Sequence, residues 1–283
     1  MKIIECPRDA MQGLTDFIPT ELKIKYINQL LKVGFDTIDA ASFVSPKAIP
    51  QLRDSAEVLD NLDLSKSKSK LLTIVANERG ALEAAKFQSI SYLGFPLSLS
   101  ETFQQRNTNK SIAQAFDVVK TIQEICVKHQ KEMVTYISMG FGNPYNEPFE
   151  ASIVSEFVDQ LNKLGIPIVS LSDTIGVSNK ENITGIFQSV SDEYPNIEFG
   201  VHLHSDLETA TDKIDAAYKA GCRRFDGAIN GFGGCPMAED KLVGNIATET
   251  ILSYLNKYNI ENTIDKSEFN NALNMAPQVF LNR

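Results

Sequence analysis

Short apolar runs alternate with longer amphipathic stretches from one end of the chain to the other. In residues 20–33, for example, Leu22, Tyr26, Ile27 and Leu30 fall at helical spacing, which predicts a helix with one apolar face. A regular alternation of short strands with longer helices is typical of repeated β-α units. The runs predict strands at residues 2–6, 37–41, 70–76, 91–99, 133–139, 167–171, 198–204 and 223–229, with further helices at 111–129, 149–164 and 207–220.

Eight strands, each followed by a helix, predict a closed (β/α)8 TIM barrel, which takes about 250 residues. The chain has 283 residues, so we expect a single domain over residues 1–283. Gly34, Gly165 and Gly221 each follow a helical pattern and precede a strand, the usual place of a C-terminal cap. The alternative is an open doubly wound sheet, but no Gly-x-Gly-x-x-Gly follows the first strand. Residues 258–283 are expected to form a C-terminal extension beneath the barrel, or a frayed tail.

Charge and composition narrow the classes of partner. A net charge of -9 and a pI near 5.0 provide no cationic field for phosphate backbones, so nucleic acid is not an expected partner. No apolar run approaches the roughly 20 residues that span a bilayer, and the N-terminus carries no secretion signal. The four cysteines form no CxxC pair, which indicates reduced thiols. We therefore expect a cytoplasmic protein without membrane contacts.

Polar residues gather where the predicted strands end, which is where TIM barrels place their active sites. Any one of these residues could be an ordinary loop residue, but their common position indicates a shared site. The strand ends carry Arg8, Asp9, Asp39, Asn77, Asp173, His202, His204 and Asn230, the last leading into a glycine-rich loop with Cys235.

His202 and His204 give the sharpest signal. The period of two along a strand places both imidazoles on one face, roughly 6.5 to 7 Å apart along the backbone, so one metal ion can be reached by either or both. Asp9 offers a hard oxygen ligand and Asn245 a neutral carbonyl. Such a mixed set suits Mg²⁺, Mn²⁺, Co²⁺ or Zn²⁺. The alternative for a strand histidine is a hydrogen-bonded core residue.

Arg8 and Cys235 each have two readings. Arg8 could form a salt bridge to Asp39 or Asp173, or it could stabilise the oxygen of a developing enolate. Cys235 could be a small buried apolar residue, as most free cysteines are. In a loop free to close over the mouth, near a metal and a cation, its thiol could instead carry a proton.

These motifs resemble those of hydroxymethylglutaryl-CoA lyase, within a metallolyase group that also includes the isopropylmalate, citramalate and homocitrate synthases. The resemblance runs over nearly the whole chain, with the motifs in family order. The Ser-Phe-Val-Ser-Pro-Lys run and the Gly-Gly-Cys-Pro loop favour the lyase over the synthases. The motifs are Pro7-Arg8-Asp9 with Gln12, residues 42–47, 173–177, 201–204 and 233–236, and Gly244-Asn245 with Thr248-Glu249.

The resemblance implies a divalent metal, Mg²⁺ or Mn²⁺, held by Asp9, His202, His204 and Asn245. It also implies an acyl-CoA substrate and a homodimer. In the implied reaction the metal binds the substrate's hydroxyl and carboxylate oxygens, and a base removes the hydroxyl proton. The carbon–carbon bond of a 3-hydroxy-3-methylglutaryl-CoA-like thioester then breaks, giving acetyl-CoA and the β-keto acid acetoacetate.

The same resemblance implies the catalytic groups. Arg8 would neutralise the enolate oxygen, Cys235 would relay protons, and Glu249 would support the site, with His202 and Asp39 beside them. Asp39 stands where the lyase pattern has a glutamate. Two further departures are Ser205-Asp206 in place of an aspartate directly after the histidine pair, and a stretch from Cys235 to Asn245 that is one residue longer.

Two alternatives to the lyase remain. The same metal site could serve a condensing synthase or an aldolase acting on a related keto acid. The chain could instead be a non-catalytic binding subunit. Against the latter, decay would be expected to remove some of the residues that are retained, namely Arg8, Asp9, His202, His204, Asn245 and Cys235.

Overall fold

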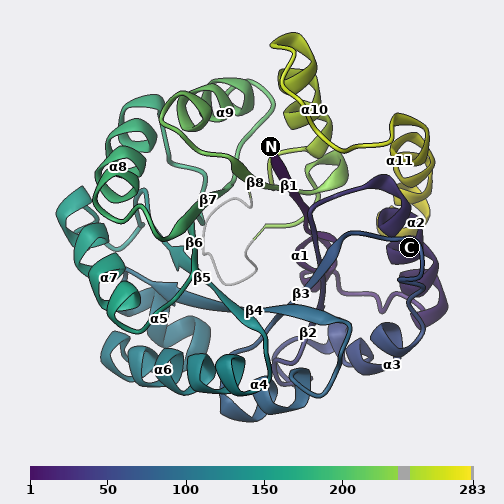
Figure 1. The fold of residues 1–283 in the computed structure, drawn as a ribbon, viewed down its shortest axis with the longest axis horizontal. Helices are drawn as coiled ribbons and strands as arrows, with labels where there is room; N and C mark the ends of the chain where they lie inside the picture. The colour runs from purple at the N-terminus through teal and green to yellow at the C-terminus, as the bar shows by residue number, and fades with distance from the viewer. Residues whose placement is uncertain (235–242, 282–283) are drawn as a thin grey trace.

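A computed structural model describes residues 1–234 and 243–281, and its strands form a closed barrel in chain order (Figure 1). Every neighbouring pair is parallel, and β8 closes the ring by pairing with β1. The predicted TIM barrel is confirmed and the open sheet is excluded. The strands are β1 Lys2–Glu5, β2 Thr37–Ser42, β3 Lys70–Ile74, β4 Ile90–Ser98, β5 Glu132–Ser138, β6 Ile168–Asp173, β7 Glu198–Leu203 and β8 Arg224–Gly227.

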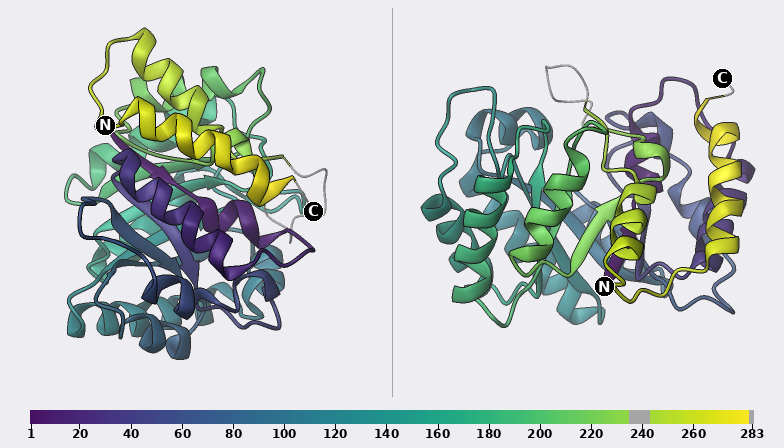
Figure 2. Two further views of the ribbon diagram at one scale, coloured as in Figure 1. Left: turned by 90° about the vertical axis from the view of Figure 1, so that its right-hand side faces the viewer. Right: turned by 90° about the horizontal axis from the view of Figure 1, so that it is seen from above.

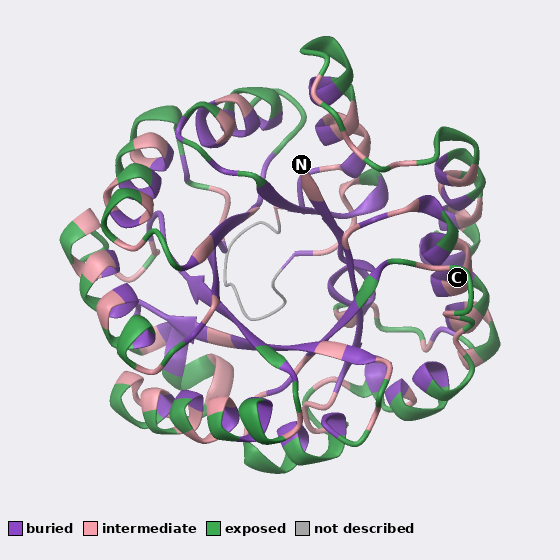
Figure 3. Cartoon of the chain, viewed as in Figure 1, coloured by how far each residue is buried: buried purple, intermediate pink, exposed green. Residues whose placement is uncertain are grey.

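Helices surround the barrel and turn their apolar faces toward it. Figure 3 shows buried residues along the strands and on the inner sides of the helices, with exposed residues on the outer sides. Within the described residues, no helix is both long and apolar enough to cross a membrane. The helices are α1 Pro7–Gln12, α2 Thr20–Val33, α3 Ser55–Asp60, α4 Glu78–Ala84, α5 Glu101–Thr108, α6 Ile112–Lys128, α7 Ala151–Lys163, α8 Lys180–Glu193, α9 Ala210–Lys219, α10 Thr248–Lys257 and α11 Lys266–Phe280, with short 3-10 helices at Pro50–Leu52 and Ile229–Gly231.

Strands β7 and β8 end earlier than their apolar patterns predict. Beyond them, His204 forms an isolated antiparallel bridge with Asn245, and Ala228 forms an isolated parallel bridge with Ala247. The segment before α10 therefore returns across the ends of both strands. This return, which the local sequence pattern does not reveal, is what places Asn245 beside the histidine pair.

The C-terminal extension packs neither beneath the barrel nor as a frayed tail in its described part. Helix α11 lies alongside α2 on the outside of the barrel (Figure 2). The rings of Tyr26 and Phe280 meet edge to face with centroids 5.7 Å apart, and the Gln29 amide donates to the Glu268 carboxylate. Helix α11 therefore packs against α2 at the side of the barrel and not beneath it.

We expect Gly34→Ala to destabilise the fold by about 1 to 3 kcal/mol. Gly34 ends α2 at a φ of 90°, and a Cβ there would collide with the Thr263 carbonyl oxygen that precedes α11. Gly185→Ala is the matched control, because a Cβ at Gly185 meets nothing within 4 Å. In that exposed helical position alanine should stabilise by about 0.5 to 1 kcal/mol. Denaturant unfolding that gives the two variants the same sign would contradict this account.

Candidate functional site

A solvent-open pocket of about 1040 Å³ lies at the carboxyl ends of the strands, where TIM barrels place their active sites. The pocket is lined both by charged groups and by apolar side chains, which form an apolar wall. The charged and imidazole groups are Arg8, Asp9, Asp39, His202 and His204, and the wall includes Val44, Ala48, Ile49 and Phe103.

Asp9, His202 and His204 meet in this pocket. One ligand atom from each lies within 4.8 Å of the others, and the Nε2 atoms of the two histidines are 3.4 Å apart. Asp9 belongs to α1, which begins at Pro7 directly after β1, so its carboxylate sits at the mouth. His202 is the penultimate residue of β7, and His204 forms the bridge beyond the strand. The structure thus brings together three of the four residues expected to hold a metal, and the fourth, Asn245, adjoins them.

Asn245 is held in place by two hydrogen bonds from its side-chain nitrogen. The nitrogen donates to Asp9 Oδ2 at 2.7 Å and to the Phe232 carbonyl at 2.9 Å. Gly233 packs against this amide at a φ of 103°, and a Cβ there would come within 2.6 Å of the Asn245 nitrogen. The glycine-rich sequence is therefore required for the close approach of this loop to Asp9 and Asn245.

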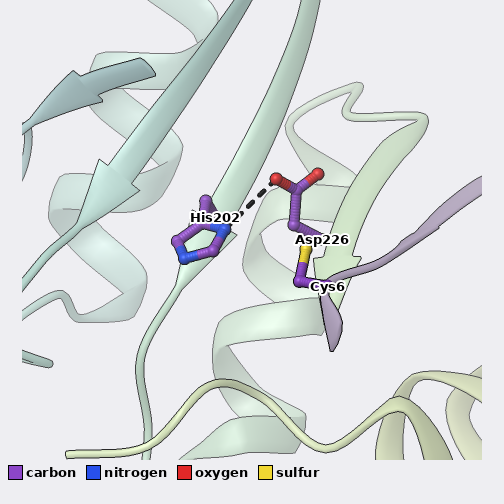
Figure 4. Close-up of side chains that lie close together, drawn as sticks. All are labelled: Cys6, His202 and Asp226. Atoms are coloured by element: carbon purple, nitrogen blue, oxygen red, sulfur yellow. Dashed lines mark hydrogen bonds and ion pairs between the residues drawn. The ribbon is translucent and has the colours of Figure 1, made fainter. Parts of the chain in front are cut away.

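The second ring nitrogen of His202 faces Asp226 on β8 (Figure 4). The distance from His202 Nδ1 to Asp226 Oδ2 is 3.2 Å. A carboxylate bound to one ring nitrogen fixes the proton there and leaves the lone pair of the other free for a metal. Asp226 was not predicted from the sequence. It lies two residues after Arg224 on β8, so both side chains are on the same, inner face of this strand.

The protonation states suit a set of metal ligands. Burial raises the pKa of Asp9, but the charges of Arg8 and of both histidines outweigh it, so the pKa is lowered overall. Burial, and then the neighbouring His202, lower the pKa of His204 to about 4. At neutral pH Asp9 is thus an anion and His204 a neutral imidazole. His204 Nδ1 is buried and has no hydrogen-bond partner within the described part of the chain. A carboxylate with two imidazoles fits a divalent cation of the Mg²⁺, Mn²⁺ or Zn²⁺ kind.

Arg8 lies at 8% exposure and forms a two-pronged ion pair with Asp39. Its Nη2 and Nε donate to Asp39 Oδ2 at 2.6 and 3.0 Å, and its Nη1 donates to Asp9 and to Gln12. Burial raises the pKa of Asp39 to about 6, with Arg8 opposing the effect. The salt-bridge reading of Arg8 is therefore correct for Asp39 and wrong for Asp173. Because the guanidinium also lines the pocket, the second hypothesis for Arg8, that it stabilises an enolate oxygen, is compatible with this ion pair.

Two residues from the predicted strand ends, Asn77 and Asp173, and Glu249, which the resemblance implied, do not join the cluster. Asn77 caps α4 by accepting the Gly80 N–H. Asp173 accepts a hydrogen bond from Lys213, and Glu249 accepts the Asn230 N–H at 3.1 Å. Each of the three stabilises a turn near the mouth. Cys235 lies outside the described residues.

The departure at Ser205-Asp206 has a structural counterpart. Asp206 accepts hydrogen bonds from Thr209 at the start of α9 and does not contact the histidine pair. Lys213, on α9, instead donates to the His204 carbonyl at 2.8 Å and to Asp173 at 3.0 Å. Its side chain is 5% exposed. No sequence signal identified Lys213, since its partners belong to other elements.

Glu5 should make stability fall as the pH rises, because burial raises its pKa from 4.5 to about 8. The folded state holds the proton between these two pH values more firmly than the unfolded chain does, so stability present below pH 4.5 is lost as the pH rises through about 8. Glu5 accepts from Thr248 Oγ1 and from the Ile229 N–H. In glutamine the amide oxygen can accept from Ile229 while the amide nitrogen donates to the Thr248 hydroxyl oxygen. We expect Glu5→Gln to remove most of this pH dependence. The stability gained by Glu5→Gln over the parent should be greater at pH 8.5 than at pH 4.5 by about 4 kcal/mol in the free energy of unfolding.

Urea unfolding at a series of pH values measures this effect. Glu57→Gln, at an exposed position of α3, is the control and should leave the pH dependence unchanged. Parallel pH curves for the parent and Glu5→Gln would show that folding does not shift the pKa of Glu5.

Comparison with known proteins identifies the family. A family model described as HMGL-like matches residues 2–276. Hydroxymethylglutaryl-CoA lyase YngG of Bacillus subtilis is 34% identical over 91% of this chain and 85% of its own. A Pseudomonas aeruginosa protein named 3-hydroxy-3-isohexenylglutaryl-CoA/hydroxy-methylglutaryl-CoA lyase is 32% identical over 92% of this chain and 85% of its own.

Comparison with solved structures indicates the same family. An HMG-CoA lyase from Acinetobacter baumannii, in complex with coenzyme A and 3-methylmalate, has a TM-score of 0.91 and 32% identity, covering 99% of this chain and 91% of that one. The carboxyl transferase domain of Rhizobium etli pyruvate carboxylase, at 13% identity and a TM-score of 0.72, shares the fold alone. With matching motifs, a matching barrel and relatives above 30% identity, the chain belongs to the HMGL-like family.

Proposed function

We propose that the chain is a divalent-metal-dependent carbon–carbon lyase that cleaves a 3-hydroxy-3-methylglutaryl-CoA-like thioester to acetyl-CoA and acetoacetate. One observation carries the proposal: the cluster of Asp9, His202 and His204 lies beside the buried guanidinium of Arg8 in one pocket. A Lewis acid and a fixed cation are what stabilise negative charge that develops on oxygen. The names of the relatives support the choice of substrate class.

The chain's own residues prepare this chemistry. Mg²⁺ or Mn²⁺ held by Asp9, His202, His204 and Asn245 would act as a Lewis acid toward the substrate's oxygens. Asp226 keeps a proton on His202 Nδ1, so that Nε2 is the atom that faces Asp9 and His204.

Arg8 is preorganised by its two-pronged pair with Asp39, which fixes the plane of the guanidinium. Its cationic face then meets the thioester oxygen as charge develops there. As the carbon–carbon bond breaks, its electron pair forms the enolate and the hydroxyl carbon becomes the ketone of acetoacetate. The hydroxyl proton leaves to a base, and Cys235 delivers a proton to the enolate carbon to complete acetyl-CoA. Glu249 supports this step indirectly through its hold on the Asn230 N–H.

The apolar wall suits the substituent at carbon 3 of the acyl group. Val44, Ile49 and Phe103 also line the pocket, and an apolar wall favours an alkyl group over a polar one. Coenzyme A in the Acinetobacter complex supports an acyl-CoA ligand.

A product assay tests the proposal. Chelator-treated protein is incubated with 3-hydroxy-3-methylglutaryl-CoA and with thioesters that carry larger 3-alkyl groups, in the presence of Mg²⁺ or Mn²⁺. Metal-dependent formation of acetyl-CoA together with the matching β-keto acid supports the lyase. Net condensation of acetyl-CoA with a keto acid, without cleavage of any thioester, would assign the site to a synthase. No turnover with any substrate despite tight metal binding would favour a binding subunit.

We expect Cys235 to be the fastest-reacting thiol of the chain and to be protected by substrate. The other three thiols, Cys6, Cys126 and Cys222, are buried, and burial raises the pKa of Cys126 and of Cys222 to about 12. Such thiols are protonated and shielded at neutral pH. Mass spectrometry after alkylation, with and without a non-cleavable substrate analogue, measures each thiol. Equal slow labelling of all four cysteines, or an unchanged kcat in Cys235→Ala, would show that Cys235 has no catalytic role.

A further inference from the structure

His202 carries a second set of donor atoms on the side of its ring that faces away from Asp9. Cys6 follows β1, Asp226 lies on β8 and His202 on β7, three strands that are neighbours in the barrel (Figure 4). The Cys6 thiol, an Asp226 carboxylate oxygen and a nitrogen of His202 all lie within 4.8 Å of one another. No step of the proposed reaction uses Cys6.

The donors of this second set are incompletely paired. Asp226 is 3% exposed, and its Oδ1 is buried with no hydrogen-bond partner among residues 1–234 and 243–281. The Cys6 thiol is 1% exposed, and its one hydrogen bond to this described part of the chain is long, a donation to the Ile4 carbonyl at 3.9 Å. A buried carboxylate oxygen without a partner is costly, and a cation in contact with it removes that cost. The arrangement thus offers a ligand site as well as an orienting contact for His202.

We propose that Cys6, His202 Nδ1 and Asp226 form a second metal site, specific for thiophilic divalent cations such as Zn²⁺ or Cd²⁺, whose occupation inhibits the enzyme. A thiol, an imidazole and a carboxylate are a donor set that such cations prefer, whereas the hard cations Mg²⁺ and Mn²⁺ disfavour a thiolate ligand. On binding, the cation loses hydration water and forms bonds to sulfur, nitrogen and oxygen. The thiol proton leaves to solvent, so no oxidant or reductant is needed.

Inhibition follows from the chemistry of the shared imidazole. A neutral imidazole has one lone pair, so a cation on Nδ1 requires the proton to move to Nε2. Nε2 is the atom that faces Asp9 and His204, and once protonated it can no longer bind the first metal. The two sites therefore exclude each other. This exclusion, unlike the binding of the thiophilic cation itself, rests on the metal of the proposed function.

Entry to the second site should be slow. His202 lines the pocket, whereas Cys6 and Asp226 lie behind its ring and are almost fully buried. A cation reaches them only when the ring rotates, so we expect inhibition by Zn²⁺ or Cd²⁺ to develop with time after mixing.

The first experiment detects binding without turnover. Metal-free protein is titrated with Cd²⁺, and the thiolate-to-metal charge-transfer absorption is recorded in the ultraviolet. The Cys235→Ala background removes the thiol to which the proposed function gives a catalytic role. There we expect one equivalent of Cd²⁺ to produce the band, Cys6→Ser to abolish it and Cys126→Ser, a remote buried control, to keep it.

A second variant guards against misfolding of Cys6→Ser. Asp226→Asn keeps the thiol and should weaken Cd²⁺ binding at least tenfold, with circular dichroism confirming the fold of each variant. A band that survives Cys6→Ser, or that is absent from the parent, would overturn the second site.

The second experiment measures exclusion. Mn²⁺ bound to the protein is followed by electron paramagnetic resonance while Cd²⁺ is added. We expect Cys6→Ser to need at least tenfold more Cd²⁺ than the parent to release Mn²⁺. Equal release in both would show that Cd²⁺ simply replaces Mn²⁺ at Asp9, His202 and His204, and would overturn the inhibitory role. A Cd²⁺ band in a protein that binds no Mn²⁺ would support the second site while contradicting the metal of the proposed function.

Discussion

His204→Ala and Asp9→Ala are each expected to lower kcat/KM by at least on the order of 10³ and to weaken Mn²⁺ binding together with it. Both side chains are at least nine-tenths buried and supply one of the few ligand atoms in the cluster. Loss of even an orienting partner of a ligand costs 10- to 100-fold in affinity, so loss of a ligand should cost more. Titration of metal-free protein with Mn²⁺ and a product assay measure the two effects separately.

His129→Ala is the matched control for these variants. His129 follows α6 and is the one other histidine in the sequence. Its removal should leave both Mn²⁺ affinity and turnover unchanged. Full activity of the parent after exhaustive chelation, with metal content verified by elemental analysis, would refute the metal requirement itself.

Arg8→Lys should lower kcat by on the order of 10² to 10³. Lysine keeps the positive charge, but it cannot reproduce the two-pronged pair with Asp39 together with the bonds to Asp9 and Gln12. The remaining ammonium would lie at a different distance and angle from the thioester oxygen. Steady-state kinetics and denaturant unfolding on the same preparations separate catalysis from stability.

Arg79→Lys, at an exposed position of α4, controls for the substitution itself and should change neither quantity. Because Arg8 and Asp39 are both buried, some loss of stability in Arg8→Lys is also expected. An Arg8→Lys enzyme within about a factor of two of the parent in kcat and KM would show that the arginine is a structural ion pair alone.

The barrel was predictable from sequence because its signal is local and repeated. The helix expected at residues 20–33 is α2 with the same bounds, since its buried face repeats at helical spacing. Strand β8 was predicted too long because apolar residues continue through Ile229, whereas pairing of Ala228 with Ala247 ends the strand. Such pairing depends on a segment nearly twenty residues further along the chain.

The centre of the site was predictable for a different reason. A period of two on one strand and a shared barrel mouth suffice to bring His202, His204 and Asp9 together. The supporting contacts were not predictable, because Asp226 and Lys213 act on the histidines from other elements. Whether Arg8 pairs with Asp39 or Asp173 likewise depended on which carboxylate lay within reach of the guanidinium.

The stacking of Phe232 on Phe280, with ring centroids 4.7 Å apart, joins the last turn of α11 to the loop that holds Asn245. Helix α11 therefore ends at the open end of the barrel, while Met1 lies at the other end (Figure 2). An affinity tag of consecutive histidines fused C-terminal to α11 would bring foreign imidazoles toward the mouth and compete for the metal ion. Recombinant protein for metal measurements should carry its tag before Met1, where the whole length of the barrel separates it from the pocket.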